Sequence, residues 1–138
     1  INIGMTADVG TFPRLPHLLP MGLVKELAFT GRRMFSNEAK DCGLVNNAFS
    51  NYDEMMKEVM QIAKEIAKKS PLAVWGSKEA INYTRGRTIE EGLNQIAMWQ
   101  AGMYNPHVDM KEALGAQIEK KDPEFEDLYP IKKGFGLL

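Results

Sequence analysis

The chain has 138 residues, of which 44% are hydrophobic and 25% charged, and its 17 basic and 18 acidic side chains give a formal net charge of -1. This composition is typical of one globular domain and excludes a disordered chain. It also argues against a nucleic-acid partner, which requires a basic surface, and no apolar run approaches the roughly 20 residues of a membrane-spanning helix.

The sequence begins with Ile1 rather than methionine, and an apolar stretch rich in small residues follows directly. No positively charged targeting segment precedes this stretch. We therefore expect the chain to be the later part of a longer polypeptide, so that a function assigned to it belongs to a larger protein.

The first fifty residues carry short structural signals. Apolar residues recur at helical spacing over 23–28 and are followed by Gly31, which predicts a helix that ends at this glycine. A second helix of one or two turns is predicted over 36–42, ended by Gly43. We interpret the short apolar run 44–49 as a buried strand.

The clearest predicted helix covers 51–69. Its apolar residues recur at steps of three and four, so they form one stripe of an amphipathic helix. The stripe consists of Tyr52, Met55, Met56, Val59, Ile62, Ala63, Ile66 and Ala67. Asn51 and Glu54 form a predicted N-terminal capping pair, and Lys68 and Lys69 lie where the helix dipole favours positive charge.

Three further helices are predicted downstream. Ser70 and Pro71 begin one that runs to about Thr84, and its small residues form a face suited to close packing against another backbone. These residues are Ala73, Gly76, Ser77 and Ala80. The capping pairs Thr88 with Glu91 and Asp109 with Glu112 begin the other two, which end at Asn105-Pro106 and near Lys120. The tail from residue 130 is expected to be poorly ordered.

Most side chains with chemical potential are better explained by packing. His17 and His107 lack a second ligand at metal spacing, so no metal site is expected. Cys42, the single cysteine, has no evident base beside it and is interpreted as an inert packed thiol. Trp75 and Trp99 are interpreted as packing residues.

The segment 4–11 differs from the rest of the chain. It places the carboxyl group of Asp8 among small and apolar residues, with Gly4 and Gly10 on either side. Glycines allow a substrate to approach the backbone closely, and an apolar setting can adapt a carboxyl group to proton transfer. The alternative from the pattern alone is that Asp8 caps a helix that begins near Thr11.

Five motifs in order resemble the crotonase superfamily, and the first resembles its Δ3,5-Δ2,4-dienoyl-CoA isomerases. The motifs are Ala-Asp-Val-Gly-Thr (7–11) with Arg-Leu-Pro (14–16), Glu-Leu-Ala-Phe-Thr-Gly-Arg (26–32), Glu-Ala (38–39) with Gly-Leu-Val (43–45), Ser-Pro-Leu-Ala-Val (70–74) with Lys78, and Glu-Lys-Lys-Asp-Pro-Glu-Phe (119–125). Lys121 departs from the arginine usual in the last motif. The resemblance covers about residues 1–125.

The resemblance implies that this chain is mainly α and forms the C-terminal part of an α/β crotonase-like fold, a ββα spiral followed by a helical trimerisation region. Residues 1–50 would then end the spiral core and carry the active-site segment. Residues 51–125 would be the helical oligomerisation region, and residues 126–138 a C-terminal tail.

The resemblance further implies an isomerase of fatty-acid β-oxidation that converts a 3,5-dienoyl-CoA into a 2,4-dienoyl-CoA. Asp8 matches the carboxylate that delivers a proton at C6. The partner glutamate, which takes the C2 proton, would stand immediately before Ile1, and the oxyanion-hole donors would lie in the earlier half of the protein. Lys120 matches a lysine that can reach CoA across a subunit boundary, although a solvated lysine at a helix end is an alternative.

Cofactor and partner expectations follow from the same resemblance. No cofactor is expected beyond the CoA that the substrate carries, and the partners are an acyl-CoA and further copies in a homo-trimer or hexamer. Alternative functions are an enoyl-CoA hydratase, for which Asp8 is a poor match, and a non-catalytic helical oligomerisation module. The compartment would be mitochondrial or peroxisomal in a eukaryote and the cytoplasm in a bacterium.

Overall fold

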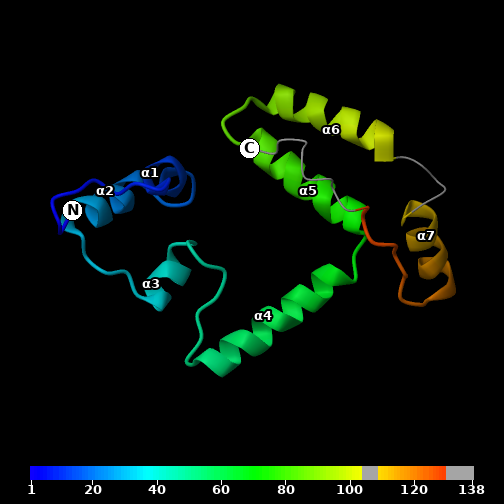
Figure 1. The fold of residues 1–138 in the computed structure, drawn as a ribbon, viewed down its shortest axis with the longest axis horizontal. Coiled ribbons are helices and arrows are strands. Elements are labelled where there is room, and N and C mark those ends of the chain that lie inside the picture. The colour runs from blue at the N-terminus through cyan, green and yellow to red at the C-terminus, as the bar shows by residue number, and fades with distance from the viewer. Residues whose placement is uncertain (104–108, 130–138) are drawn as a thin grey trace. The chain divides into compact units, whose positions relative to one another are not determined.

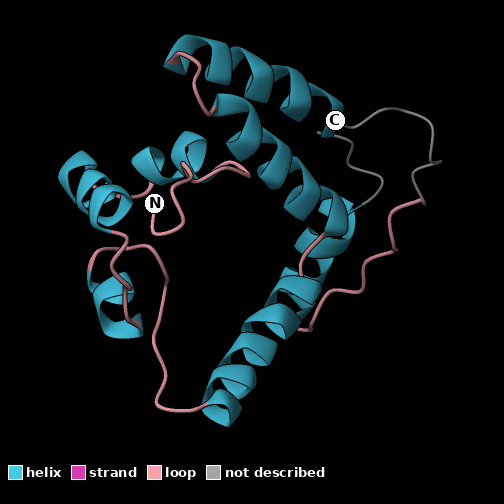
Figure 2. Cartoon of the chain, turned by 60° about the vertical axis from the view of Figure 1, so that its left-hand side comes forward, coloured by secondary structure: helices cyan, strands magenta, loops and turns pink. Residues whose placement is uncertain are grey.

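The structure is a computed structural model that describes residues 1–103 and 109–129. Within these ranges the chain consists of helices and loops without a strand (Figures 1 and 2). The elements in chain order are α1 (Thr11–Arg14), the 3₁₀ helix η1 (Leu15–His17), α2 (Met21–Thr30), α3 (Ser36–Asp41), α4 (Tyr52–Ala67), α5 (Pro71–Thr84), α6 (Ile89–Met103) and α7 (Asp109–Glu119). The prediction of a mainly helical chain is confirmed.

Two compact units divide the chain, Ile1–Glu58 and Val59–Leu138, and the boundary falls inside α4. The first unit contains α1, η1, α2 and α3. Its buried hydrophobic side chains are those of Leu19, Val24 and Ala39. Glycine ends both longer helices of this unit as predicted, because Gly31 (φ 62°) and Gly43 (φ 79°) take the left-handed conformation that follows a helix C-terminus.

The predicted strand at 44–49 is wrong. The backbone N–H groups of Leu44 and Val45 donate to the carbonyl oxygen of Ala39, at 2.8 and 3.2 Å, and so complete the end of α3. Val45 is 39% exposed rather than buried. A strand also needs a neighbour to pair with, and the described part of the chain provides none.

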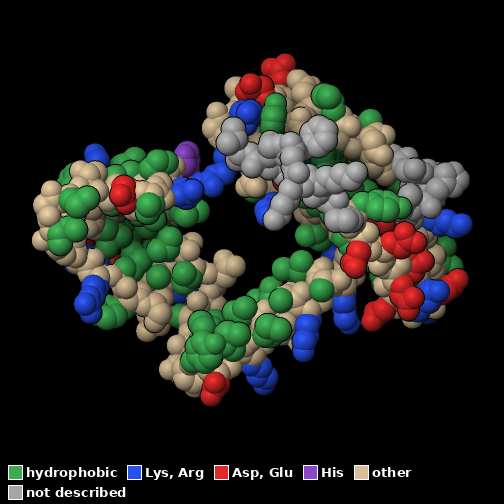
Figure 3. All heavy atoms as spheres, viewed as in Figure 1, with side chains coloured by type: hydrophobic (Ala, Val, Ile, Leu, Met, Phe, Trp, Pro, Cys, Tyr) green, Lys and Arg blue, Asp and Glu red, His purple; other side chains and the backbone are tan. Residues whose placement is uncertain are grey.

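Helix α4 begins where its capping residue predicts. The Asn51 Oδ1 atom accepts a hydrogen bond from the Glu54 N–H at 2.9 Å, while the Glu54 carboxylate accepts one from the Ser50 hydroxyl. No side chain of α4 is buried, and Figure 3 shows apolar side chains along one side of the helix and lysines along the other.

None of the helices in the described ranges is long and apolar enough to cross a membrane.

Local capping signals define the start of α5 and of α6. The Ser70 hydroxyl oxygen accepts from the Ala73 N–H at 3.0 Å, which caps α5. Thr88 and Glu91 form a complete capping box, in which the Thr88 N–H donates to Glu91 Oε2 at 2.9 Å and the Glu91 N–H donates to Thr88 Oγ1 at 3.2 Å. Both predicted helix starts are therefore confirmed.

Helices α5 and α6 pack through glycine. The buried Gly76 faces the indole of Trp99, because a Cβ added to this glycine would lie 2.5 Å from Trp99 Cε2 and 2.8 Å from Cζ2. The Trp75 and Trp99 rings meet edge to face, with centroids 5.2 Å apart. The predicted small-residue face is thus used for close packing, although an indole rather than a backbone segment lies against it.

Helix α7 joins the second unit through contacts that its sequence pattern did not reveal. The Asp109 carboxylate accepts a hydrogen bond from the Ser70 hydroxyl, and Glu112 Oε1 accepts from the Glu124 N–H at 2.9 Å. The two carboxylates predicted to form a capping pair therefore hold segments distant in sequence. The predicted break at residues 105–106 and the tail from residue 130 lie outside the described residues.

Candidate active site

Asp8 lies in a tight turn immediately before α1. Its backbone carbonyl oxygen accepts from the Thr11 N–H at 3.0 Å and from Thr11 Oγ1 at 3.1 Å. The N-cap position of α1 belongs to Gly10, without a side-chain capping hydrogen bond. Asp8 therefore does not act as a side-chain cap, and its exposed carboxylate takes no hydrogen bond from the residues that the structure describes.

The backbone of this turn is unusual after Asp8. Val9 has φ 42° and Gly10 has φ 86°, so two consecutive residues take the left-handed conformation. The Arg14 guanidinium closes the turn, since its Nη1 atom donates to the Val9 carbonyl oxygen at 2.9 Å. The position of Asp8 is thus fixed by two side chains of α1, those of Thr11 and Arg14.

An apolar cavity of about 320 Å³ lies beside this turn in the first unit. Its lining comes from the segment on both sides of Asp8 and from α2 and the residue after it. The lining residues are Ile1, Met5, Thr6, Ala7, Thr11, Phe12, Leu15, Val24, Leu27, Ala28, Phe29 and Gly31. Asp8 itself is exposed and is not among them, but Ala7 and Thr11 are, so the turn borders an apolar space of the size of a short hydrocarbon chain.

Lys120, the second predicted site residue, follows α7 in the second unit. It takes the left-handed conformation (φ 55°) that usually requires glycine at a helix end, and its side chain is exposed. The neighbouring Lys121 pairs with Glu119 at 2.8 Å, and this hydrogen bond raises the pKa of Lys121. Glu119 and Lys121 both line a charged cavity of about 740 Å³ next to α7, whereas Lys120 does not.

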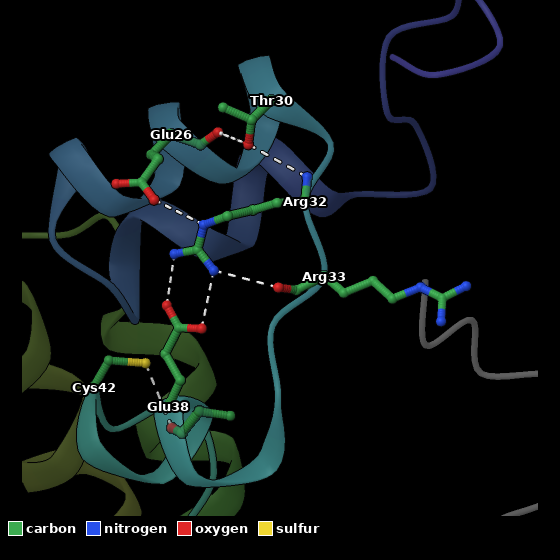
Figure 4. Close-up of polar contacts among 7 residues, drawn as sticks. Glu26, Thr30, Arg32, Arg33, Glu38 and Cys42 are labelled. Carbon is green, nitrogen blue, oxygen red and sulfur yellow. Dashed lines mark hydrogen bonds and ion pairs between the residues drawn. The ribbon is translucent and has the colours of Figure 1, made fainter.

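A cluster of three charged residues joins α2 to α3 in the first unit (Figure 4). Arg32 Nε donates to Glu26 Oε1 at 2.7 Å, and its two terminal nitrogens donate to the two carboxylate oxygens of Glu38 at 2.6 and 2.9 Å. These contacts raise the pKa of Arg32 and lower the pKa of Glu38. The motif residues at 26, 32 and 38 thus have a structural role, which their regular six-residue spacing alone did not reveal.

The Arg32 cluster predicts a pH-dependent loss of stability in the variant Arg32→Ala. Because its pKa is lowered, Glu38 contributes stability that is complete above the unfolded-state pKa of about 4.3 and is lost as pH falls through the folded-state value. We expect Arg32→Ala to lower the thermal unfolding midpoint at pH 7, and the difference from the parent protein to shrink toward pH 3. Arg33→Ala is the matched control, because the Arg33 side chain extends away from the cluster (Figure 4). A difference that stays constant with pH contradicts this assignment.

No group of three or more His, Cys, Asp or Glu side chains in the described ranges is arranged to hold a metal ion. The arrangement that remains is a mainly helical chain with one acidic turn, clamped by α1, beside an apolar cavity. Such a turn can hold a proton donor or acceptor next to a hydrocarbon substrate.

Comparison with known proteins identifies the family. The family model described as enoyl-CoA hydratase/isomerase matches residues 1–128. The mitochondrial Δ(3,5)-Δ(2,4)-dienoyl-CoA isomerase of Rattus norvegicus is 40% identical over 123 residues, which are 88% of this chain and 37% of that protein. The peroxisomal isomerase of the same name from Arabidopsis thaliana is 39% identical over 128 residues, 93% of this chain and 46% of that protein.

A solved structure supports the same conclusion. The enoyl-CoA hydratase from Bacillus anthracis matches with a TM-score of 0.83 and 32% identity, over 90% of this chain and 47% of that one. The chain belongs to the enoyl-CoA hydratase/isomerase family, which confirms the resemblance to the crotonase superfamily. It spans less than half the length of the relatives described above.

Proposed function

We propose that the full-length protein containing this sequence is an isomerase that converts 3,5-dienoyl-CoA into 2,4-dienoyl-CoA in fatty-acid β-oxidation. The observation that carries the proposal is the Asp8 turn, in which Thr11 and Arg14 hold the backbone while the carboxylate stays out of the helix cap. The apolar cavity lined by Ala7 and Thr11 supplies a surface for the hydrocarbon part of the substrate. Relatives that share 39–40% identity carry the name of this activity.

The proposed reaction consists of two proton transfers, one from C2 to a base and one from Asp8 to C6. A base removes the C2 proton, which leaves a trienolate conjugated from the thioester oxygen to C6. The protonated Asp8 carboxyl group then gives its proton to C6, so that the double bonds come to lie between C2 and C3 and between C4 and C5. The base has gained a proton and Asp8 has lost one, and exchange with water restores both groups.

The proposed mechanism needs two further parts, a base for the C2 proton and N–H donors for the thioester oxygen. The resemblance implies that the C2 base and the N–H donors for the thioester oxygen come from the preceding part of the protein. Such donors stabilise the negative charge of the trienolate. The chemistry needs no cofactor beyond the CoA of the substrate. For Lys120, exposed at the end of α7, we propose a contact with the negatively charged part of CoA.

A second candidate reaction is the addition of water to a 2-enoyl-CoA, which the name of the Bacillus anthracis relative favours. Hydration requires two groups that activate one water molecule, and the Asp8 turn supplies one carboxylate. Incubating the full-length protein with a 3,5-dienoyl-CoA and, separately, with a 2-enoyl-CoA distinguishes the two. We expect a conjugated 2,4-diene of unchanged mass from the first substrate, and little product from the second. A product one water heavier from the 2-enoyl-CoA, with no isomerisation, contradicts the isomerase proposal.

A third candidate, of a different class, is a non-catalytic oligomerisation module. The apolar side of α4 favours an oligomeric role, because Val59, Ile62 and Ile66 remain 46–52% exposed in this chain. We propose that this face contributes to a homo-trimer or hexamer in the full-length isomerase. A trimeric protein without any acyl-CoA turnover would favour the module instead.

The mitochondrial and peroxisomal names of the relatives suggest one of these organelles if the source is a eukaryote.

A further inference from the structure

The turn that carries Asp8 has a conformation that needs external support. A valine rarely takes a positive φ, since its branched Cβ crowds the backbone in the left-handed region, and Val9 does so at φ 42° with its side chain 89% exposed. Burial of the Val9 side chain therefore does not hold this conformation in the described chain. Contacts to the backbone atoms of the turn remain to hold it.

Arg14 makes the contact that spans both left-handed residues. Its Nη1 atom donates to the Val9 carbonyl oxygen at 2.9 Å. The guanidinium also occupies the space next to Gly10 where any other residue would have its Cβ, because a Cβ added there would lie 2.8 Å from Arg14 Cζ. Gly10 thus serves two purposes, since it permits φ 86° and makes room for the arginine.

We propose that Arg14 is a positioning residue, which acts on the reaction by holding the Asp8–Val9–Gly10 turn and thereby the Asp8 carboxyl group in place. This inference rests on the function proposed above. Without the guanidinium, Val9 is free to relax to a negative φ, and the rotation reorients the peptide that joins it to Asp8. The carboxyl group would then move relative to C6 of the substrate, and a displacement of about 1 Å is enough to cost roughly 100-fold in rate.

The direct test uses Arg14→Met and Arg14→Lys in the full-length protein, with a 3,5-dienoyl-CoA as substrate. We expect Arg14→Met to lower kcat roughly 10- to 100-fold while KM changes little, because the arginine contacts the turn rather than the substrate. Arg14→Lys should recover part of this loss, since an ammonium group can donate to the Val9 carbonyl oxygen but cannot cover Gly10 as a planar group does. Arg33→Met is the matched control and should retain the parent kcat.

A double-mutant cycle with Asp8→Asn distinguishes positioning from other roles. If Arg14 acts through Asp8, then Arg14→Met lowers kcat in the parent protein but has almost no further effect in the Asp8→Asn protein. An equal loss in both backgrounds, an unchanged kcat of Arg14→Met, or a rise in KM as the main effect contradicts the inference about Arg14. Should Arg14→Met fail to fold, the same cycle with Arg14→Lys decides between these outcomes.

The turnover of the Asp8→Asn protein shows whether the proposed function itself fails. If the Asp8→Asn protein turns over the dienoyl-CoA as fast as the parent, Asp8 is not part of the reaction and both proposals fall. If Asp8→Asn abolishes turnover while the Arg14 variants show no coupling to it, the function stands and only the positioning role of Arg14 is rejected.

Discussion

The Asp8→Asn variant of the full-length protein is expected to lose roughly 10²- to 10⁴-fold in the turnover of a 3,5-dienoyl-CoA, the usual contribution of one proton-transfer group. Asparagine keeps the size of the side chain but has no acidic proton to deliver at C6. The turn should survive, because Thr11 binds the Asp8 backbone oxygen and Arg14 binds the Val9 oxygen, and neither contact uses the carboxylate. Turnover is followed by the absorbance of the conjugated diene.

The matched control is Asp41→Asn, which alters an exposed carboxylate at the end of α3 in the same unit. We expect this variant to retain the parent rate. The binding of the acyl-CoA should also persist in Asp8→Asn, because the apolar cavity is lined by other side chains. If Asp8→Asn turns over the 3,5-dienoyl-CoA at the parent rate, the Asp8 carboxyl group of the parent protein takes no part in the reaction.

The largest expected effect on stability comes from Gly76→Ala. The added methyl group would overlap the indole of Trp99, whose Cε2 and Cζ2 atoms lie 2.5 and 2.8 Å from the position of the new Cβ. The ring and helix α6 would have to move, and overpacking of this kind destabilises a protein by about 1–3 kcal/mol. A urea or thermal unfolding series of the parent protein and the variant measures the loss.

Gly102→Ala in α6 is the matched control for this substitution. Among the described residues nothing lies within 4 Å of the Cβ that it would add, and alanine favours the helix by up to about 1 kcal/mol over glycine. The two variants should therefore change the stability in opposite directions. Equal midpoints for Gly76→Ala and the parent protein would contradict the close packing of α5 against α6.

Sequence patterns predicted the elements whose cause is local. Ser70 caps α5 through an N–H three residues away, and the Thr88 and Glu91 box forms within one turn of α6. Gly31 ends α2 because its backbone takes a left-handed conformation that needs no distant partner. Such signals depend on neighbours in the sequence, so they can be read without knowledge of the fold.

Features that depend on distant residues were predicted less well. The apolar run 44–49 resembled a strand, but its first amides complete α3 and no partner strand is present in the described ranges. The Asp109 carboxylate pairs with Ser70, 39 residues away, which no local pattern indicates. The sequence singled out Asp8, whereas the support that Arg14 gives its turn became visible only in the structure.

Isomerisation in deuterium oxide tests most directly whether the Asp8 carboxyl group delivers the proton to C6. The exposed carboxyl group exchanges with solvent, so the parent protein should place deuterium at C6 of the 2,4-dienoyl-CoA. Asp8→Asn should still exchange hydrogen at C2 of the substrate, where a different group acts, but should incorporate deuterium at C6 roughly 10²- to 10⁴-fold more slowly than the parent protein. Equal rates of deuterium incorporation at C6 by the two proteins would contradict a proton-donor role of Asp8.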